Sequence, residues 1–198
     1  MEVLNLDVQK KCRAVFLDRD GTINVERDYL YKIEDFEFIP GTPEAIRRLK
    51  EAGFLVIVVS TQTGVGRGYY SEDDVDRLHR HIQQQLAAYG TCIDAFYFCP
   101  HHPEQGEGAY RTDCDCRKGE PGMILQAASE YGIDLEQSWM IGDKLADLEA
   151  GERAGCRTIL VLTGYGEQTL TKLGLRAEQV CFAKDLAQAA SMIYSAPH

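Results

Sequence analysis

Two carboxylates lie two residues apart in the stretch DRDGT, where Asp18 and Asp20 follow a short apolar run. A third, Asp143, ends another apolar run in the distant stretch IGDKLAD. Carboxylate ligands without neighbouring cysteines suit Mg²⁺, and like charges that converge on one site need such a cation. Asp and Gly are also ordinary turn residues, so DRDGT alone is as consistent with a simple turn as with a metal site. The two motifs together predict a magnesium site.

Groups that could hold a phosphoryl oxygen follow a further apolar run. Ser60 ends the run FLVIVVS and precedes Thr61, Gln62 and Thr63 in a glycine-rich turn. A hydroxyl and exposed backbone amides at a strand end suit a phosphoryl oxygen. Lys118, in the stretch CRKG, adds a cation. Metal, lysine, hydroxyl and amides together neutralise a transferring phosphoryl group, and a carboxylate can be the nucleophile that receives it.

Four potential metal ligands surround a polar loop: Cys99, His101, Cys114 and Cys116. Three thiolates and one imidazole form a complete tetrahedral set for structural Zn²⁺, with no open position for chemistry. The spacings are CxH and CxC rather than CxxC, so spacing alone is equally consistent with a disulfide or with chance. His102 is a further possible ligand. The chain has seven cysteines, an odd number, which argues against a disulfide framework in a reducing compartment.

The flanks of this loop favour zinc. The loop leaves the end of a predicted strand and returns directly into Arg117 and Lys118. Ordering the polar residues His102–Asp113 costs roughly 1–2 kcal/mol per residue, which a bound metal can offset. We therefore expect a structural zinc that holds the two cations over a phosphate.

The elements that must position these residues alternate between apolar runs and amphipathic stretches. Such alternation predicts a parallel sheet covered on both faces, with ligands at the carboxyl ends of the strands. We also expect a small hairpin over Tyr29–Gly41, a helix capped by Thr42 that ends before Gly53, and a capping box formed by Ser71 and Asp74. The predicted strands are Arg13–Asp18, Phe54–Ser60, Asp94–Cys99, Ser138–Asp143 and Cys156–Gly164.

Composition limits the classes of function. The 198 residues suit one domain, and 44% hydrophobic content is normal for a soluble protein. A net charge of −10 argues against a surface that binds nucleic acid. There is no apolar run of membrane-spanning length, and the first residues lack the order of a signal peptide. We expect a cytoplasmic protein without membrane or nucleic-acid partners.

Four stretches resemble the motifs of the haloacid dehalogenase (HAD) superfamily of phosphohydrolases: FLDRDGTIN, VVSTQTG, CRKGEPGM and MIGDKLAD. They occur in family order between about Ala14 and Gly164. DRDGTIN, GRGYY and the CPHH…CDCRK loop are more closely similar to the branch that acts on heptose bisphosphates and histidinol phosphate. The resemblance implies an α/β, HAD-like Rossmannoid three-layer sandwich with a mostly parallel sheet, a zinc-binding loop and no large cap, as a single domain over residues 1–198.

The resemblance also implies roles for the site residues. Asp18 is the expected nucleophile, and Asp20 the acid that protonates the leaving oxygen and then the base that activates water. Mg²⁺ is expected on the Asp18 carboxylate, the Asp20 main-chain carbonyl and Asp143, with Asp147 in support. Zn²⁺ is expected on the four ligands that include the first histidine of the loop. Ser60 and Lys118 are expected to steady the phosphoryl group. The expected substrate-binding residues are Glu26, Arg27, Asp28, Tyr29, Ser60, Thr61, Gln62, Thr63, Arg117, Lys118 and Lys144.

The implied function is a Mg²⁺-dependent phosphomonoesterase. The implied substrate is D-glycero-D-manno-heptose 1,7-bisphosphate, attacked at its 7-phosphate through an aspartyl-phosphate, in the biosynthesis of nucleotide-activated heptose for lipopolysaccharide. Hydrolysis of histidinol phosphate is the alternative. The family implies a monomer. Two other classes are weaker: a dinucleotide-binding protein, from the glycines of GVGRG, and a zinc-loop binding module without catalysis.

Two positions depart from the family pattern. The family usually has Asn where this chain has Thr61, and Pro where it has Gly119. Thr can serve if position 61 offers mainly its backbone amide to phosphate, and glycine should loosen the loop beside Lys118. His79 and His81 lie on a long polar helix, where we expect both to be solvated.

Overall fold

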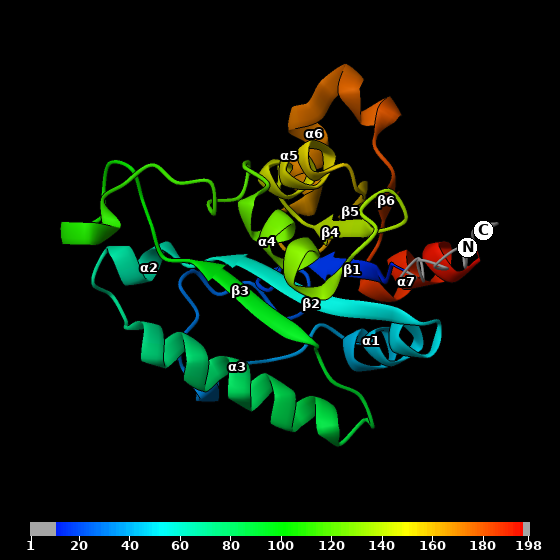
Figure 1. Cartoon of the computed structure of the whole chain (residues 1–198), viewed down its shortest axis with the longest axis horizontal. Coiled ribbons are helices and arrows are strands. Elements are labelled where there is room, and N and C mark those ends of the chain that lie inside the picture. Colours follow the sequence, from blue (N-terminus) through cyan, green and yellow to red (C-terminus); the bar gives the residue numbers. More distant parts are fainter. Residues whose placement is uncertain (1–10, 196–198) are drawn as a thin grey trace, which may run out of the picture.

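A six-stranded parallel sheet forms the centre of the computed structural model of the chain, which describes residues 11–195 (Figure 1). The strand order is β3-β2-β1-β4-β5-β6, and all five pairings are parallel. The carboxyl ends of the strands therefore gather at one edge, as predicted. The strands are β1 (Arg13–Leu17), β2 (Phe54–Thr61), β3 (Ala95–Cys99), β4 (Trp139–Gly142), β5 (Arg157–Val161) and β6 (Phe182–Ala183).

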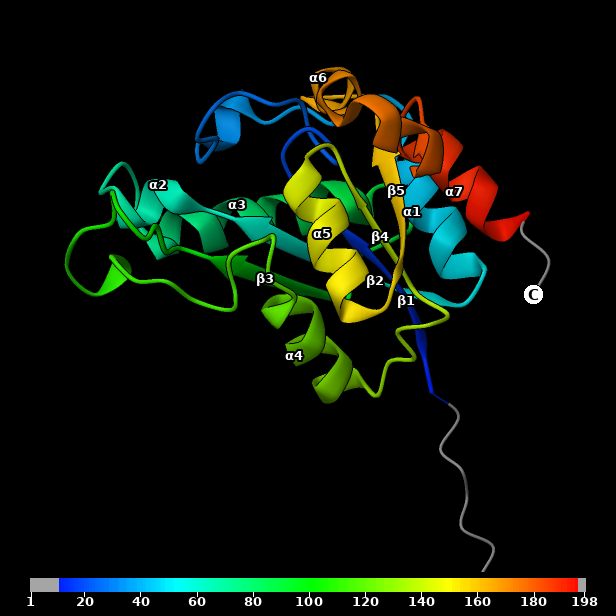
Figure 2. The same ribbon diagram turned by 90° about the horizontal axis from the view of Figure 1, so that it is seen from above.

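Helices cover both faces of the sheet, as Figure 2 shows. They are α1 (Thr42–Glu51), α2 (Thr63–Gly66), α3 (Glu72–Ala87), α4 (Gly122–Tyr131), α5 (Leu145–Ala154), α6 (Gly166–Leu173) and α7 (Leu186–Tyr194). Val15 and Leu17 of β1 pack in one apolar core with α1, α3 and α7, whereas Ala14 and Phe16 pack in the other with α4 and α5. All four side chains are fully buried. Burial on both faces explains why the four residues after Arg13 are all apolar rather than alternating with polar ones.

The starts of two helices test the predicted caps. At α3 the box is confirmed: the Asp74 backbone N–H donates to Ser71 Oγ at 3.2 Å, and the Ser71 backbone N–H donates to Asp74 Oδ2 at 2.9 Å. At α1 the prediction is wrong by one residue, because Gly41 is the N-cap, with φ 83°, and Thr42 is the first helical residue. Glycine reaches this left-handed conformation without the strain that a Cβ would cause.

The predicted hairpin over residues 29–41 is wrong. Its centre is a 3-10 turn at Ile33–Asp35, and the later residues pair with an earlier segment instead. The Val25 backbone N–H donates to Glu37 O at 2.9 Å, and the Ile39 backbone N–H donates to Ile23 O at 3.0 Å. These two hydrogen bonds close the loop of residues 26–36, so both of its ends lie beside the residues that follow DRDGT.

The first two glycines of GVGRG, Gly64 and Gly66, lie in the short helix α2 and serve close packing. A Cβ on Gly64 would lie 2.2 Å from the Tyr70 ring, and one on Gly66 would lie 2.5 Å from the Pro100 carbonyl oxygen. The turn follows β2 and leads into α3, and Gly66 also bonds through its backbone to Pro100 and Glu107 in the loop after β3. These contacts account for both glycines without a dinucleotide.

The prediction that His79 is solvated is wrong. Its side chain is 5% exposed and stacks on Phe96 of β3 with ring centroids 4.4 Å apart. Burial lowers its pKa to about 3. The reason is positional, since His79 shares the inward face of α3 with Val75, Leu78 and Ile82. His81 is half-buried and contacts Phe36 edge to face.

No helix within residues 11–195 combines the length and apolar content that crossing a bilayer requires.

Candidate active site

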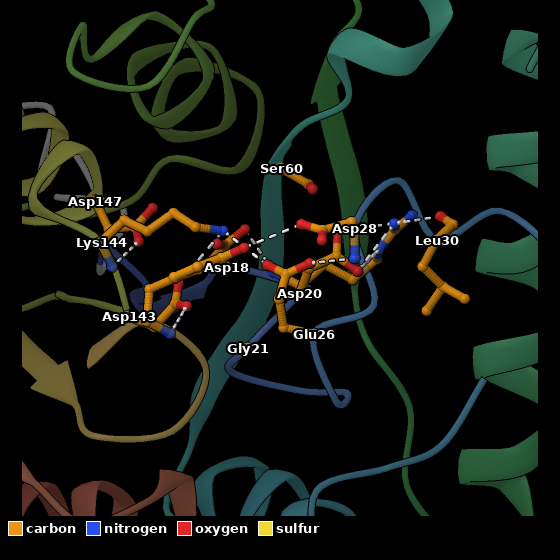
Figure 3. Close-up of polar contacts among 12 residues, drawn as sticks. Asp18, Asp20, Gly21, Glu26, Asp28, Leu30, Ser60, Asp143, Lys144 and Asp147 are labelled. Carbon is orange, nitrogen blue, oxygen red and sulfur yellow. Dashed lines mark hydrogen bonds and ion pairs between the residues drawn. The ribbon is translucent and has the colours of Figure 1, made fainter. Parts of the chain in front are cut away.

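A cavity of about 340 Å³ opens where β1 and β2 end and where α5 begins. Asp18, Asp20 and Ser60 converge on it from two strands, and Lys144 reaches it from the turn after β4 (Figure 3). The predicted site residues that line the cavity are Asp18, Asp20, Glu26, Asp28, Tyr29, Ser60, Thr61, Gln62, Thr63, Arg117, Lys118 and Lys144.

Three buried carboxylates form what we call the carboxylate cluster: Asp18, Asp143 and Asp147. One oxygen from each lies within 4.8 Å of the other two. The ammonium of Lys118 bridges two members, at 2.5 Å from Asp18 Oδ1 and 2.7 Å from Asp147 Oδ1. The backbone N–H of Lys144 donates to Asp147 Oδ2 at 2.9 Å, so the start of α5 also fixes that carboxylate.

Burial and neighbouring charge set the protonation of this cluster. Burial raises the pKa of Asp18, which the Lys118 ammonium only partly opposes. Burial and the Asp18 charge raise the pKa of Asp143 to about 7. Burial also disfavours the charge on Lys118, but the carboxylates of Asp147 and Asp18 outweigh it and raise the Lys118 pKa. A buried site with more carboxylates than cations favours a bound cation.

The turn after β1 brings Asp143 close to the backbone. Gly21 has φ 82°, and a Cβ there would lie 2.3 Å from Asp143 Oδ2. The backbone N–H of Tyr165 donates to the same oxygen at 2.8 Å. DRDGT therefore needs its glycine for two reasons, the turn conformation and the space that Asp143 occupies.

Asp20 is held by a different set of partners. Its Oδ2 receives hydrogen bonds from Arg19 at 2.8 Å and Gln62 at 3.1 Å, and its Oδ1 receives one from Asn24 at 3.0 Å. Burial opposes ionisation of Asp20, but the Arg19 guanidinium and these hydrogen bonds outweigh it and lower the pKa of the carboxyl. Arg19 itself is fully buried and also donates to the Leu30 carbonyl at 2.9 Å (Figure 3).

The loop after DRDGTIN closes one side of the cavity. Glu26 pairs with Lys144 at 2.9 Å, and Tyr165 O–H donates to Asp28 at 3.0 Å. Asp28 and Tyr29 have φ of 37° and 58°, a conformation that non-glycine residues adopt rarely. Arg27 is the predicted substrate-binding residue that does not line the cavity, because it is half-exposed and pairs with Glu37 at 2.9 Å.

The four predicted zinc ligands come together at the end of β3, in what we call the Cys/His cluster: Cys99, His101, Cys114 and Cys116. Cys99 Sγ lies 3.5 Å from Cys114 Sγ, and His101 Nδ1 lies 3.3 Å from Cys116 Sγ. Ligands of a tetrahedral zinc lie about 3.3–3.8 Å apart, given bonds of about 2.0–2.3 Å. All seven cysteines are free of disulfides in the structure, and the four donors face one another as metal ligands do.

The Cys/His cluster leads directly to the cations of the cavity. Arg117 donates to the His101 carbonyl at 3.2 Å, and the backbone N–H of Lys118 donates to Thr61 Oγ1 at 3.4 Å. The backbone N–H of Gly119 then donates to the Ala146 carbonyl at 3.0 Å. The segment 117–119 is thus tied to the cluster, to the end of β2 and to α5.

Comparison with known proteins agrees with this geometry. Residues 115–189 match a family model described as HAD-hydrolase-like. The chain is 48% identical over 153 residues to the D-glycero-beta-D-manno-heptose-1,7-bisphosphate 7-phosphatase of Pasteurella multocida, which covers 77% of this chain and 83% of the relative. The enzyme of the same name from Escherichia coli K12 is 44% identical over 156 residues, with 78% and 82% covered. The chain belongs to this family of HAD-like phosphatases.

Solved structures of the family share the fold. The D,D-heptose 1,7-bisphosphate phosphatase of B. bronchiseptica, complexed with magnesium and phosphate, superposes with a TM-score of 0.82 at 35% identity, over 92% of this chain and 98% of that chain. The enzyme from Burkholderia thailandensis gives 0.69 at 33% identity, over 93% and 99%. The predicted α/β, HAD-like fold with a parallel sheet is therefore confirmed.

The carboxylate cluster of this family member fits a divalent cation. Asp143 Oδ1 is buried and receives no hydrogen bond from residues 11–195, and the Lys144 ammonium lies 3.8 Å from it. A site made of carboxylate oxygens, one of them without a hydrogen-bond partner, suits Mg²⁺, which prefers hard oxygen ligands. The Cys/His cluster fits zinc by its donor types and by the separations given above.

Sequence reasoning missed several residues of the site. Tyr70 and Tyr165 line the cavity, and Arg19 and Asn24 hold Asp20. Tyr165 could have been found, because it follows β5 at the same edge of the sheet. Arg19 could not, since a charged residue between two carboxylates gives no sign that it is buried.

Proposed function

We propose that the chain hydrolyses the 7-phosphate of D-glycero-D-manno-heptose 1,7-bisphosphate through an aspartyl-phosphate. One observation carries the proposal: a buried Asp18, bridged to Asp147 by Lys118, faces a cavity of about 340 Å³ with Asp20 and Ser60 on its walls. A carboxylate nucleophile, an acid–base group and phosphate-binding donors are the groups that phosphoryl transfer needs.

In the first step, a carboxylate oxygen of Asp18 attacks phosphorus, and the bond from phosphorus to the sugar oxygen breaks. Asp20 gives its proton to that oxygen. The resting carboxyl of Asp20 has a lowered pKa. The negative charge of a bound phosphate raises it, so substrate binding favours the protonated form.

In the second step, Asp20 accepts a proton from a water molecule whose oxygen attacks the phosphorus of the aspartyl-phosphate. The bond between phosphorus and Asp18 breaks, inorganic phosphate leaves and both carboxyl groups return to their starting states. Lys118 and the Ser60 hydroxyl hold the phosphoryl oxygens throughout, because both are fixed by the protein before the substrate arrives.

A magnesium ion would be held by the carboxylates of Asp18 and Asp143 and by the Asp20 main-chain carbonyl. Bound there, it neutralises negative charge on the phosphoryl group. Asp147 supports the site indirectly by holding Lys118. Zinc on the Cys/His cluster has a structural role, since four protein ligands leave no position for substrate.

The cations of the cavity favour a substrate with a second phosphate. Arg117 and Lys144 line the cavity beyond Lys118, and the loop of Glu26, Asp28 and Tyr29 offers polar groups for sugar hydroxyls. The relatives named above are phosphatases of heptose 1,7-bisphosphate. We place the reaction in the cytoplasm, in a monomeric enzyme that supplies nucleotide-activated heptose synthesis.

A substrate panel tests the proposal. Phosphate release is measured with Mg²⁺ for both anomers of the heptose bisphosphate, fructose 1,6-bisphosphate and histidinol phosphate. We expect the highest kcat/KM for one heptose anomer and loss of turnover when Mg²⁺ is omitted after gel filtration. A higher kcat/KM for histidinol phosphate would overturn the substrate assignment, and turnover that ignores Mg²⁺ would overturn the metal assignment.

A further inference from the structure

The side chain of Gln62 lies between the two groups that the reaction needs. Its Nε2 donates to Ser60 Oγ at 2.6 Å and to Asp20 Oδ2 at 3.1 Å. Its Oε1 accepts from Arg19 at 3.2 Å and from the Tyr70 hydroxyl at 2.8 Å. An amide has two donor hydrogens and two acceptor lone pairs, so the protein uses its full capacity.

The chemistry of the partners fixes which way this amide faces. The Arg19 guanidinium can only donate, so it must meet the oxygen, and an ionised Asp20 can only accept, so it must meet the nitrogen. Gln62 is 2% exposed, and Tyr70 is 7% exposed. A flip of the amide would put a guanidinium against an N–H and a carboxylate against an oxygen, both buried, which is unfavourable.

The fixed amide in turn orients the Ser60 hydroxyl. Because Ser60 Oγ accepts from Gln62, its own hydrogen points elsewhere, and within residues 11–195 it donates to no protein acceptor. Ser60 is 1% exposed and lines the cavity. Its hydrogen is therefore available to an oxygen of a phosphoryl group in the cavity.

We propose that Gln62 is a positioning residue that aims the Ser60 hydroxyl and the Asp20 carboxyl at the same phosphoryl group. This rests on the proposed function, which makes Asp20 the acid–base group. It also changes the role expected from sequence, where Gln62 belonged to the substrate-binding residues. An amide whose four hydrogen-bonding positions are filled by Ser60, Asp20, Arg19 and Tyr70 has no capacity left for substrate.

Two substitutions at Gln62 separate positioning from support of the fold. Gln62→Met keeps the length of the side chain and removes all four hydrogen bonds. Gln62→Glu keeps an acceptor for Arg19 and Tyr70 but, when ionised, donates to neither Ser60 nor Asp20. We expect each to lower kcat by about 10- to 100-fold with KM within about 3-fold, because a misaimed donor weakens the transition state more than substrate binding.

The choice of leaving group shows whether the effect passes through Asp20. p-Nitrophenolate leaves readily without a proton, whereas a sugar alkoxide needs one. Gln62→Met should therefore lower kcat/KM less for p-nitrophenyl phosphate than for the sugar phosphate that the wild-type enzyme hydrolyses fastest. The double variant with Ser60→Ala should lose less activity than the product of the two single losses, because the residues act together.

Gln83→Met is the matched control. The Gln83 amide is likewise hydrogen-bonded on both sides, in its case to the backbone of Ile93 at 2.7 and 2.8 Å. It lies on α3 outside the cavity. It should leave kcat within about 2-fold of wild type whatever its effect on thermal unfolding. Wild-type kcat in Gln62→Glu, a rise in KM alone, or equal losses for both leaving groups would overturn the positioning role. A wild-type enzyme that cleaves p-nitrophenyl phosphate but no heptose bisphosphate would overturn the substrate assignment and leave the Gln62 comparison standing.

Discussion

The carboxylate cluster and the Cys/His cluster lie at the same edge of the sheet but differ in what surrounds them. Asp18, Asp143 and Asp147 come from strand ends and a helix start and are almost completely buried, and two of them, Asp18 and Asp147, line the cavity. The four ligands of the Cys/His cluster come from one strand end and one loop, and they face one another. A metal at the first would have an incomplete set of protein ligands beside open space, whereas a metal at the second would have a complete set of four.

This difference suits the carboxylate cluster to chemistry and the Cys/His cluster to structural support. An incomplete shell leaves positions for substrate and a metal, whereas a complete shell can only hold the chain in place. The two clusters are nevertheless adjacent in sequence, since the ligand Cys116 is followed by Arg117, which bonds to the His101 carbonyl, and by Lys118, which enters the carboxylate cluster. Substitutions in the Cys/His cluster should therefore lower activity too, but by less than substitutions in the carboxylate cluster.

The largest effect is expected in the carboxylate cluster itself. Asp18→Asn removes the attacking carboxylate but keeps the size of the side chain, so phosphate release should fall by at least about 10⁴-fold with the fold retained. Steady-state phosphate release and thermal unfolding measure the two properties. Activity close to wild type would remove Asp18 from the mechanism.

A smaller but clear effect is expected from the Cys/His cluster. Cys114→Ser should lose zinc, lower the unfolding temperature and reduce kcat/KM by about 10- to 100-fold, because Arg117 and Lys118 lose their anchor. Zinc content, thermal unfolding and kcat/KM are compared with Cys92→Ser, which alters an exposed cysteine outside the cluster. Normal folding and turnover in a zinc-free Cys114→Ser protein would show that the clusters are independent.

The link between the clusters can be disturbed at Gly119. Restoring the usual family residue with Gly119→Pro should destabilise the protein by about 3 kcal/mol and lower kcat/KM several-fold, because φ is 101° and the N–H bonds to Ala146. Gly119→Ala separates the two causes: it keeps the N–H and its Cβ would meet only Glu149 at 3.8 Å, but φ 101° strains any residue with a Cβ, so it should be destabilised as well, by less than Gly119→Pro. A Gly119→Pro protein as stable and active as wild type would mean that this segment can be rebuilt without cost.

The smallest effect is expected at Thr61. Its Oγ1 accepts a hydrogen bond from the Lys118 backbone at 3.4 Å, and the side-chain oxygen of Asn can take over that part. Thr61→Asn should leave kcat/KM within about 3-fold of wild type or better. A loss above 10-fold, measured alongside unchanged thermal unfolding, would show that the threonine side chain has a specific role.

Much of the fold and site could be predicted because short-range patterns encode them. Apolar runs marked the five longer strands to within three residues at each end, since the central residues of strands covered on both faces must be apolar. Polar residues just after those runs had to meet at one edge, which placed Asp18, Ser60 and Asp143 together. The Cys/His ligands were recognisable because they lie close in sequence on either side of one loop.

Only the tertiary structure decided which way individual side chains turn. Gln62 bonds to Asp20 across 42 positions, and Arg27 points away to Glu37 instead of lining the cavity. His79 is buried because its helix face meets β3, although polar residues predominate along that helix. A pattern of residue types determines where a segment must be buried, but a side chain's hydrogen-bond partners depend on segments that folding brings together. For that reason the sequence determined which carboxylates and hydroxyls gather at the edge of the sheet, and the structure decided how Gln62 and Arg19 hold Asp20 and Ser60 there.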